Sequence, residues 1–338
     1  MTKLYFAIDD ALVVLTTEGE HARCDVHLKG SDIGCVTVDP LHPQLVYCGT
    51  LGSGLWRSDN AGESWRPAGE GIRHSRVQSV TVSRSEQVKG RGVVYAGTEP
   101  SAIFRSKDGG DTWIECSDLA SLPSASEWSF PPRPETHHVR WIEADPHVQG
   151  RLFVAVEAGA LIRSPDSGTT WQDRTARGPR DSHQLSIHLS APNRLYSAAG
   201  DGYFESRDGG DTWQQYEKGL RHRYLWSIAV DPADPDNIIL SAAASPWQSH
   251  SGPAESYLYR RVVGSPWQEL RDGLPKPAGR HSAVLAAHPN EPGTFFAAWE
   301  RDVFRSVNGG ANWDRLDVTW PEHSRVNEIC ALAVAAVS

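Results

Sequence analysis

Short apolar segments separated by polar turn segments recur along the whole chain, and they do not show the ~3.6-residue period of an amphipathic helix. The clearest repeated unit is an apolar segment, a turn marked by proline, and a second apolar segment. Apolar runs of about four to eight residues bounded by such turns predict pairs of β-strands. The unit occurs at residues 35–50, 141–156, 227–242 and 284–299, and it predicts an all-β chain.

A second pattern, Ser-x-Asp-x-Gly-x-Thr-Trp, follows the paired strands. Its Asp or Asn can accept hydrogen bonds from backbone N–H groups further along, its Gly permits a positive φ, and its Trp buries a large ring. We therefore interpret the acidic residues of this box as turn residues, and not as calcium ligands or catalytic acids. The box occurs at 57–65, 105–113, 163–171, 205–213 and 305–313 and, in a degenerate form, at 260–267.

The tryptophans that end the boxes lie about 42 to 58 residues apart, a spacing typical of a β-propeller built from four-stranded blades. A lone strand is expected at 326–334, whereas the N-terminal strands lack an innermost partner. We therefore predict one all-β domain, 1–338, a seven-bladed propeller in which the C-terminal strand joins the N-terminal blade and removes exposed sheet edges. Insertions at about 117–136 and 244–256 are expected to lie over one end of the ring.

The boxes resemble those of the BNR/Asp-box repeat superfamily, which includes sialidases, sortilin-type receptors, xyloglucan-degrading glycosidases and photosystem II assembly factors. The resemblance implies a propeller and leaves the function open, because one fold carries many activities. Sialidases also need three arginines that grip a carboxylate, a Tyr–Glu pair and an acidic Asp. Their Arg-Ile-Pro segment is missing, and Gly30-Ser31-Asp32-Ile33 stands in its place. No sialidase residue is therefore carried over.

Composition narrows the range of partners. The chain has 33 basic and 42 acidic residues, a net charge of −9, and no basic stripe, so we expect no nucleic-acid partner. No stretch approaches the ~20 apolar residues of a membrane span, and the first residues read as a strand and not as a signal peptide. Five cysteines without paired spacing favour reduced thiols and a cytoplasmic location. We expect no nucleotide cofactor.

The loops that lead into the innermost strands of a propeller surround the mouth of its channel, opposite the boxes. We call this end the top face. Half of the histidines of the chain stand in these loops, which is the strongest functional signal in the sequence. They are His74, His137, His138, His183, His222, His281 and His323.

Aligning the blades on the turn after the innermost strand gives equivalent positions at this mouth. Neutral imidazoles bind zinc, copper and iron. We therefore expect a transition metal (zinc, copper, iron or manganese), with His138, His183, His281, His323 and Asp32 as ligands. The alternative is that each histidine binds a neighbouring backbone carbonyl and recurs through common ancestry of the blades. The aligned residues are Asp32, Arg76, His138, His183, Tyr224 and His281, with His323 or Arg325 in the closing blade.

Other groups on the top face suit acid/base chemistry or substrate binding. Glu157 and Glu300 are acid/base candidates in loops between apolar strands, and Tyr224 is a candidate nucleophile. Arg76 and Arg140 would hold a polar or anionic substrate. The aromatic residues of the two insertions would either wall a pocket or cover a blade edge; they are Trp128, Phe130 and Trp247.

These features predict a propeller that binds a small polar or anionic molecule at the channel mouth. We favour an enzyme, a metal-dependent lyase, hydrolase or oxygenase. The first alternative is a sialidase-like glycoside hydrolase that acts on a glycan. The second is a non-enzymatic scaffold that binds a protein partner or assists assembly.

Overall fold

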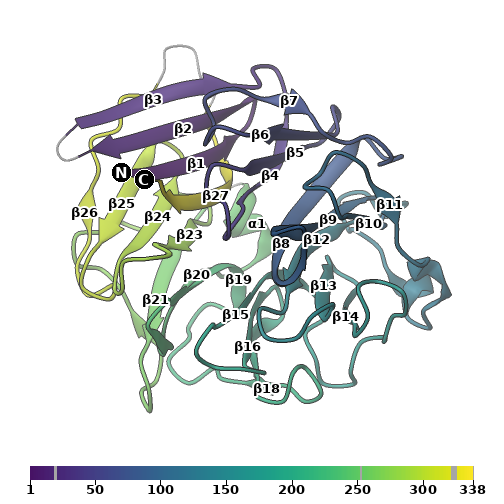
Figure 1. Ribbon diagram of the computed structural model, residues 1–338. Coiled ribbons are helices and arrows are strands. Elements are labelled where there is room, and N and C mark those ends of the chain that lie inside the picture. Colours follow the sequence, from purple (N-terminus) through teal and green to yellow (C-terminus); the bar gives the residue numbers. More distant parts are fainter. Residues whose placement is uncertain (19–20, 252, 321–325, 338) are drawn as a thin grey trace.

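The computed structural model describes residues 1–18, 21–251, 253–320 and 326–337, and within these ranges the chain forms seven β-sheets arranged in a ring (Figure 1). The prediction of a seven-bladed β-propeller is confirmed. The innermost strands surround a central channel. In ring order they are β27 (Ile329–Ala336), β4 (Ile33–Val38), β8 (Arg76–Val88), β12 (Val139–Ala144), β15 (Ser182–Ile187), β19 (Tyr224–Asp231) and β23 (Val284–Ala287).

The remaining strands of each blade follow outward in chain order. Blade 1 contains β27, β1 (Thr2–Ile8), β2 (Ala11–Glu18) and β3 (His21–His27). The second strands of blades 2 to 7 are β5 (Val46–Thr50), β9 (Arg91–Glu99), β13 (Leu152–Val156), β16 (Leu195–Ala199), β20 (Asp234–Ala243) and β24 (Phe295–Trp299). The third strands are β6 (Leu55–Ser58), β10 (Ile103–Ser106), β14 (Ala160–Ser164), β17 (Gly202–Ser206), β21 (Tyr257–Arg261) and β25 (Asp302–Ser306). The fourth strands are β7 (Arg66–Pro67), β11 (Ile114–Glu115), β18 (Gln214–Gln215), β22 (Gln268–Glu269) and β26 (Asp314–Arg315), and a bridge between Arg163 and Gln172 takes this place in blade 4.

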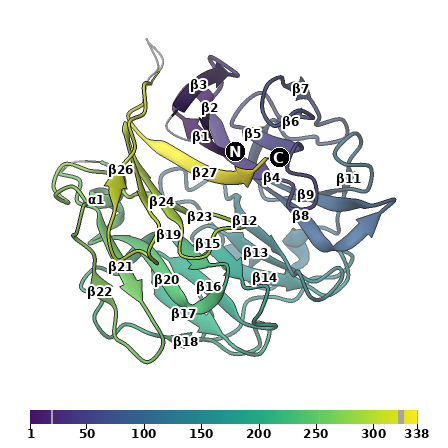
Figure 2. The ribbon, with the colours of Figure 1, turned by 60° about the vertical axis from the view of Figure 1, so that its left-hand side comes forward.

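The two ends of the chain meet in blade 1. Strand β27 pairs antiparallel with β1, so that Leu4 lies opposite Val334 and Phe6 opposite Leu332. Figure 2 shows this last strand lying between β1 and the channel. The predicted closure by the C-terminal strand is therefore confirmed, and it pairs the inner edge that β1 would otherwise expose.

The boxes form turns in which the polar side chains make hydrogen bonds within the turn. In blade 3, Ser106 Oγ accepts a hydrogen bond from the Gly110 N–H (2.7 Å), and Asp108 accepts one from the Thr112 N–H (3.0 Å). Burial acts to raise the pKa of Asp108, but these hydrogen bonds and that from the Thr112 hydroxyl outweigh it and lower the pKa to about 2. Gly110 has a φ of +89°, and a Cβ there would lie 2.9 Å from the ring of Tyr47 in blade 2. The box aspartate is thus explained by the turn alone.

Arginines of the boxes join neighbouring blades. Arg57 donates to the carbonyl of Gly109, and Arg105 donates to that of Ser167, in each case on the box turn of the next blade. The box of blade 5 begins with Glu205 where Arg57 and Arg105 begin the boxes of blades 2 and 3. The following box, in blade 6, is the degenerate one, and it has Arg261 where the other boxes have serine. Arg261 donates to Glu205 Oε2 (2.5 Å), so a reversed ion pair joins blades 5 and 6.

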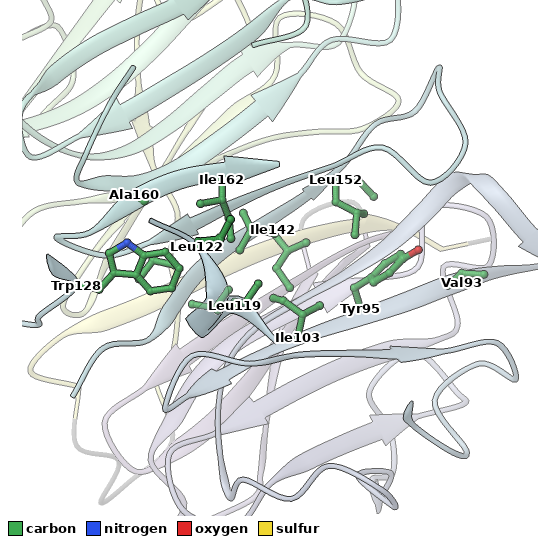
Figure 3. Close-up of a cluster of buried hydrophobic side chains, with 14 residues drawn as sticks. Val93, Tyr95, Ile103, Leu119, Leu122, Trp128, Ile142, Leu152, Ala160 and Ile162 are labelled. Carbon is green, nitrogen blue, oxygen red and sulfur yellow. The ribbon is translucent and has the colours of Figure 1, made fainter. Parts of the chain in front are cut away.

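The insertion after blade 3 packs between blades instead of forming a pocket wall. It contains two short 3-10 helices, Leu119–Ser121 and Ala125–Glu127, and Trp128 is buried in the cluster between blades 3 and 4 (Figure 3). Its indole N–H donates to Ser124 Oγ (3.0 Å). The interpretation that this insertion covers blade edges is therefore favoured.

The second insertion contains helix α1 (Pro246–His250), on which Trp247 is 63% exposed. In the described ranges no helix is long and apolar enough to cross a membrane.

Candidate functional site

Irregular strand pairing places one residue from each of six blades on the wall of the channel. In the described chain, six innermost strands have a β-bulge near their top end, where one residue lacks a partner on the second strand. Bulges re-aim side chains and are frequent beside active sites. The bulged residues are Gly34, Gln78, Arg140, His183, Trp226 and Cys330, and all six line a cavity of about 150 Å³. We call this cavity the upper chamber.

His183 presents an unsatisfied nitrogen to two carboxylates. The side chain is 1% exposed, and its Nδ1 lies 2.6 Å from the carbonyl oxygen of Leu225, so Nδ1 carries the proton. Nε2 has no hydrogen-bond partner among the described residues, and it lies 3.6 Å from Asp181 Oδ2 and 3.9 Å from Glu157 Oε1. An unprotonated Nε2 would turn its lone pair toward the two carboxylates and be repelled by them, and either a metal ion between them or a proton on Nε2 removes that repulsion. The three residues place one ligand atom each within 4.8 Å of one another.

Each of these residues is held by the local backbone. Glu157 directly follows β13, and Asp181 directly precedes β15. Asp181 Oδ1 accepts a hydrogen bond from the Ala158 N–H (2.8 Å). Loops of blades 4 and 5 therefore fix the two carboxylates beside the bulged His183.

Glu157 is ionised. Its Oε2 lies 2.7 Å from His138 Nε2 and 3.7 Å from Arg140 Nε. Burial acts to raise its pKa, but the hydrogen bond from His138 and the charges of His183 and Arg140 outweigh it and lower the pKa to about 2. Glu157 is thus suited to bind a cation or accept a proton, and it is unsuited to act as a general acid.

Arg140 has donors to spare. Its guanidinium lies over the ring of Trp226 (4.5 Å), and its Nε has no hydrogen-bond partner among the described residues. Trp226 in turn contacts His250 (4.2 Å between ring centres), which binds Glu328 (2.9 Å). A stacked guanidinium with free N–H groups on a chamber wall is a binding group for an oxyanion.

Tyr224 lies beside this group as a neutral phenol. It is buried, and its ring centre is 5.0 Å from that of His183. Burial and the negative charge of Glu157 raise its pKa. The predicted role as a nucleophile therefore has no support at neutral pH, while the protonated phenol can donate a hydrogen bond.

Arg76 belongs to a separate cluster. Its Nε donates to Glu99 Oε2 (2.9 Å), which also binds Arg133 (2.8 Å) and Gln78 (3.0 Å). Burial acts to raise the pKa of Glu99, but hydrogen bonds from Arg76 and Gln78 outweigh it and lower the pKa. Arg76 is thus already paired with a carboxylate.

His281 and Glu300 form a third cluster. The His281 N–H donates to Glu300 Oε1 (2.9 Å), and His281 Nδ1 lies 3.3 Å from the carbonyl oxygen of Asn327. Burial raises the pKa of Glu300. Asp32 is exposed, and His323 lies outside the described residues. The structure thus brings together His138, Arg140, Glu157, His183 and Tyr224, and it places Arg76, His281 and Glu300 in other groups.

The alignment of the blades by sequence placed blade 5 two residues out of register. In blade 4 the turn after the innermost strand is closed by Asp145, whose Oδ1 accepts from the His147 N–H (2.7 Å). In blade 5, Nδ1 of His188 takes this role and accepts from the Ser190 N–H (3.1 Å). Counted from His188, the equivalent of His138 is Asp181, and His183 is the equivalent of Arg140. Asp181 was therefore missed, and so was Trp226, which occupies the same ring as Arg140.

No family model and no curated protein matches the chain. It is similar to an ancestral GH74 enzyme (TM-score 0.63, 18% identity, 84% of this chain and 38% of that one). It is also similar to YCF48 bound to D1 peptide (0.59, 18%, 84% and 80%) and to the WD40 β-propeller domain of Doa1 (0.61, 12%, 90% and 88%). The chain thus spans well under half of the GH74 enzyme. At these identities the comparisons show the propeller fold alone, and the link to the BNR/Asp-box superfamily stays a resemblance.

Proposed function

We propose that this propeller is a metal-dependent enzyme acting on a small anionic molecule in the upper chamber, with a divalent transition metal held by His183, Asp181 and Glu157. The observation that carries the proposal is the buried Nε2 of His183, which faces two carboxylate oxygens at 3.6 and 3.9 Å without a hydrogen-bond partner among the described residues. The predicted ligands His281 and Asp32 have no part in this set.

The donor set fits such a metal. One imidazole and two carboxylates suit zinc, iron or manganese, and with three protein ligands a position stays open for water or substrate. A metal bound there would act as a Lewis acid or lower the pKa of a bound water. His138 supports the site from behind, because its hydrogen bond fixes the Glu157 carboxylate (2.7 Å).

The remaining side chains would bind the substrate. The guanidinium of Arg140 would hold a carboxylate or similar oxyanion, since its donors lie on the chamber wall beside Glu157. The neutral phenol of Tyr224 would donate a hydrogen bond near His183. Trp226 supplies an apolar wall that limits water access.

Metal analysis of the untagged protein tests this proposal. We expect near-stoichiometric zinc, copper, iron or manganese by inductively coupled plasma mass spectrometry, and loss of the metal in His183→Gln. Asp181→Asn keeps the size of the side chain and the acceptor for the Ala158 N–H, yet it should weaken metal binding by about tenfold or more.

His281→Gln is the matched control, because His281 belongs to another cluster of the same face. Wild-type protein that stays metal-free after incubation with each metal would contradict the proposal. A loss of metal in His281→Gln instead of His183→Gln would contradict it equally.

The variant Gly200→Ala tests the metal site without replacing any of the proposed metal-binding residues. A Cβ at Gly200 would lie 2.1 Å from Asp181 Oδ2, so Gly200→Ala must displace that carboxylate. We expect metal affinity to fall by about tenfold with a small change in melting temperature, because the displaced atom ends a flexible side chain. Gly52→Ala is the control, since a Cβ there meets no atom within 4 Å. Unchanged metal affinity in Gly200→Ala would remove Asp181 from the ligand set.

Glycoside hydrolysis has less support in this site. It needs a carboxyl group of raised pKa beside a second carboxylate. The pKa of Glu157 is lowered to about 2, and Glu300, whose pKa is raised, lies in another cluster near Arg280. Glu143, whose pKa is raised by burial to about 7, lines the upper chamber, but its carboxylate accepts the indole N–H of Trp141 (3.1 Å).

The scaffold alternative would use the outer top face, where Trp247 is exposed. A metal-free wild-type protein would direct the work to glycan and protein-partner screens.

A further inference from the structure

The channel has a second cavity at the end opposite the top face. It has a volume of about 310 Å³ and is lined by the last residues of the innermost strands and by the turns that follow them. We call it the lower chamber. Both chambers share Thr37, Thr81 and Glu143 in their walls, so these residues mark the level where the two cavities meet. A space of this size can hold a small organic molecule.

Arg84 is an unpaired cation in the wall of the lower chamber. It is half-buried, and within the described ranges its guanidinium makes no hydrogen bond or ion pair. By contrast, the guanidinium of Arg151 binds Asp145 (2.5 Å) and that of Arg194 binds Glu205 (2.8 Å). Burial lowers the pKa of Arg84. A guanidinium that is partly withdrawn from water and makes no hydrogen bond is destabilised, and an anion in the chamber would offset part of that cost.

The two histidines in the wall of the lower chamber, His188 and His288, are already hydrogen-bonded to neighbouring turns. His188 Nε2 donates to the carbonyl of Asp231 (2.7 Å), and its Nδ1 is used by Ser190. His288 Nδ1 likewise accepts from the Asn290 N–H (3.2 Å). Both imidazoles are thus engaged in the turns, and Arg84 is the chamber wall's cationic anchor.

The ligand should carry a single negative charge. Burial raises the pKa of Glu143 to about 7, and the carboxylate of Asp145 adds to the effect. Asp39 is buried and acts electrostatically on Arg84. One guanidinium with acidic groups around it disfavours a multiply charged anion. Val82, Ile187 and Val230 give the chamber apolar walls, which suit an apolar body on the ligand.

We propose that the lower chamber is a second binding site, which takes a small monocarboxylate with an apolar body. Its carboxylate binds Arg84, and its apolar part lies against Val82, Ile187 and Val230. The site is separate from the metal site and does not depend on the proposed function.

Calorimetric titration of the full chain with benzoate at pH 8 tests this inference. We expect saturable binding, at least about tenfold weaker binding in Arg84→Gln, and no change in His281→Gln, which alters a separate cluster on the top face. Inorganic phosphate should bind more weakly than benzoate, because it carries more charge and no apolar body. Glu143→Gln should tighten benzoate binding a few-fold, since it removes a competing negative charge, and a folding defect could not produce that gain.

Three results would overturn the inference. They are a wild-type protein that does not bind benzoate, equal binding in wild type and Arg84→Gln, and a loss of binding in Arg140→Gln with Arg84→Gln unaffected. The last would place the anion in the upper chamber. The metal content of Arg84→Gln should stay at the wild-type level, because Arg84 lines only the lower chamber, so a failure here is distinguishable from a failure of the metal site.

Discussion

Replacing Glu205 with alanine is expected to lower the free energy of unfolding by about 3–5 kcal/mol. Glu205 is 2% exposed and binds Arg194 (2.8 Å), Arg207 (2.8 Å) and Arg261 (2.5 Å). Burial acts to raise its pKa, but the hydrogen bonds from Arg261 and Arg194 outweigh it and lower the pKa. Truncation would leave Arg261 with uncompensated charge in the contact between blades 5 and 6, and Arg194 with Asp236 as its remaining carboxylate partner. Denaturant unfolding of the purified variant measures the loss.

Asp59→Ala is the matched control for this prediction. Asp59 also binds arginine, but its side chain is 47% exposed, and exposed ion pairs contribute about 0–1 kcal/mol. A double-mutant cycle with Arg261→Ala should show strong coupling, because removing both partners leaves less charge unpaired. A cost below about 1 kcal/mol for Glu205→Ala would mean that the reversed ion pair does not hold the two blades together.

The second large effect is expected at Trp213, the tryptophan of the blade 5 box. It is buried against Phe153 of blade 4 and Leu185 and Phe204 of blade 5. Trp213→Ala would empty a packed site between blades and should cost about 3–5 kcal/mol. Thermal and denaturant unfolding would measure this loss, and metal content should persist in the fraction that stays folded.

Trp247→Ala provides the comparison, because Trp247 is largely exposed and its removal should change stability by about 0.5 kcal/mol or less. Equal costs at the two positions would contradict the role assigned to the box tryptophans. Loss of metal from folded Trp213→Ala would show that the packing between blades 4 and 5 also sets the geometry of Asp181 and Glu157.

The ring could be predicted because its turns are made by residues with strong local preferences. Asp108, Gly110 and Trp113 each do in the structure what their chemistry predicts, as hydrogen-bond acceptor, positive-φ residue and buried ring. The closing strand could be predicted because a seven-bladed ring needs an inner strand for blade 1.

The candidate site could be predicted only in part. His138, His183, Glu157 and Arg140 were identified, but their mutual arrangement depends on β-bulges that interrupt the alternation of strand residues. The alignment failed in blade 5 because His188 Nδ1 replaces a carboxylate oxygen as the acceptor in the turn. That substitution hid Asp181, since an alignment on Asp-Pro shifts the blade by two residues. No local signal distinguishes Trp226 from the buried aromatic residues of the core.

The pairing of β27 with β1 also sets the order of events during synthesis. Strands β1 to β3 leave the ribosome before the strands of the other blades, yet the inner edge of β1 stays unpaired until β27 has been made. Exposed strand edges invite pairing with other chains, so the nascent protein passes through a long period in which it depends on chaperones or on fast completion. Cys330, which β27 contributes to the upper chamber, is among the last wall residues to be synthesised. The wall of the upper chamber is therefore complete only after translation has passed this strand.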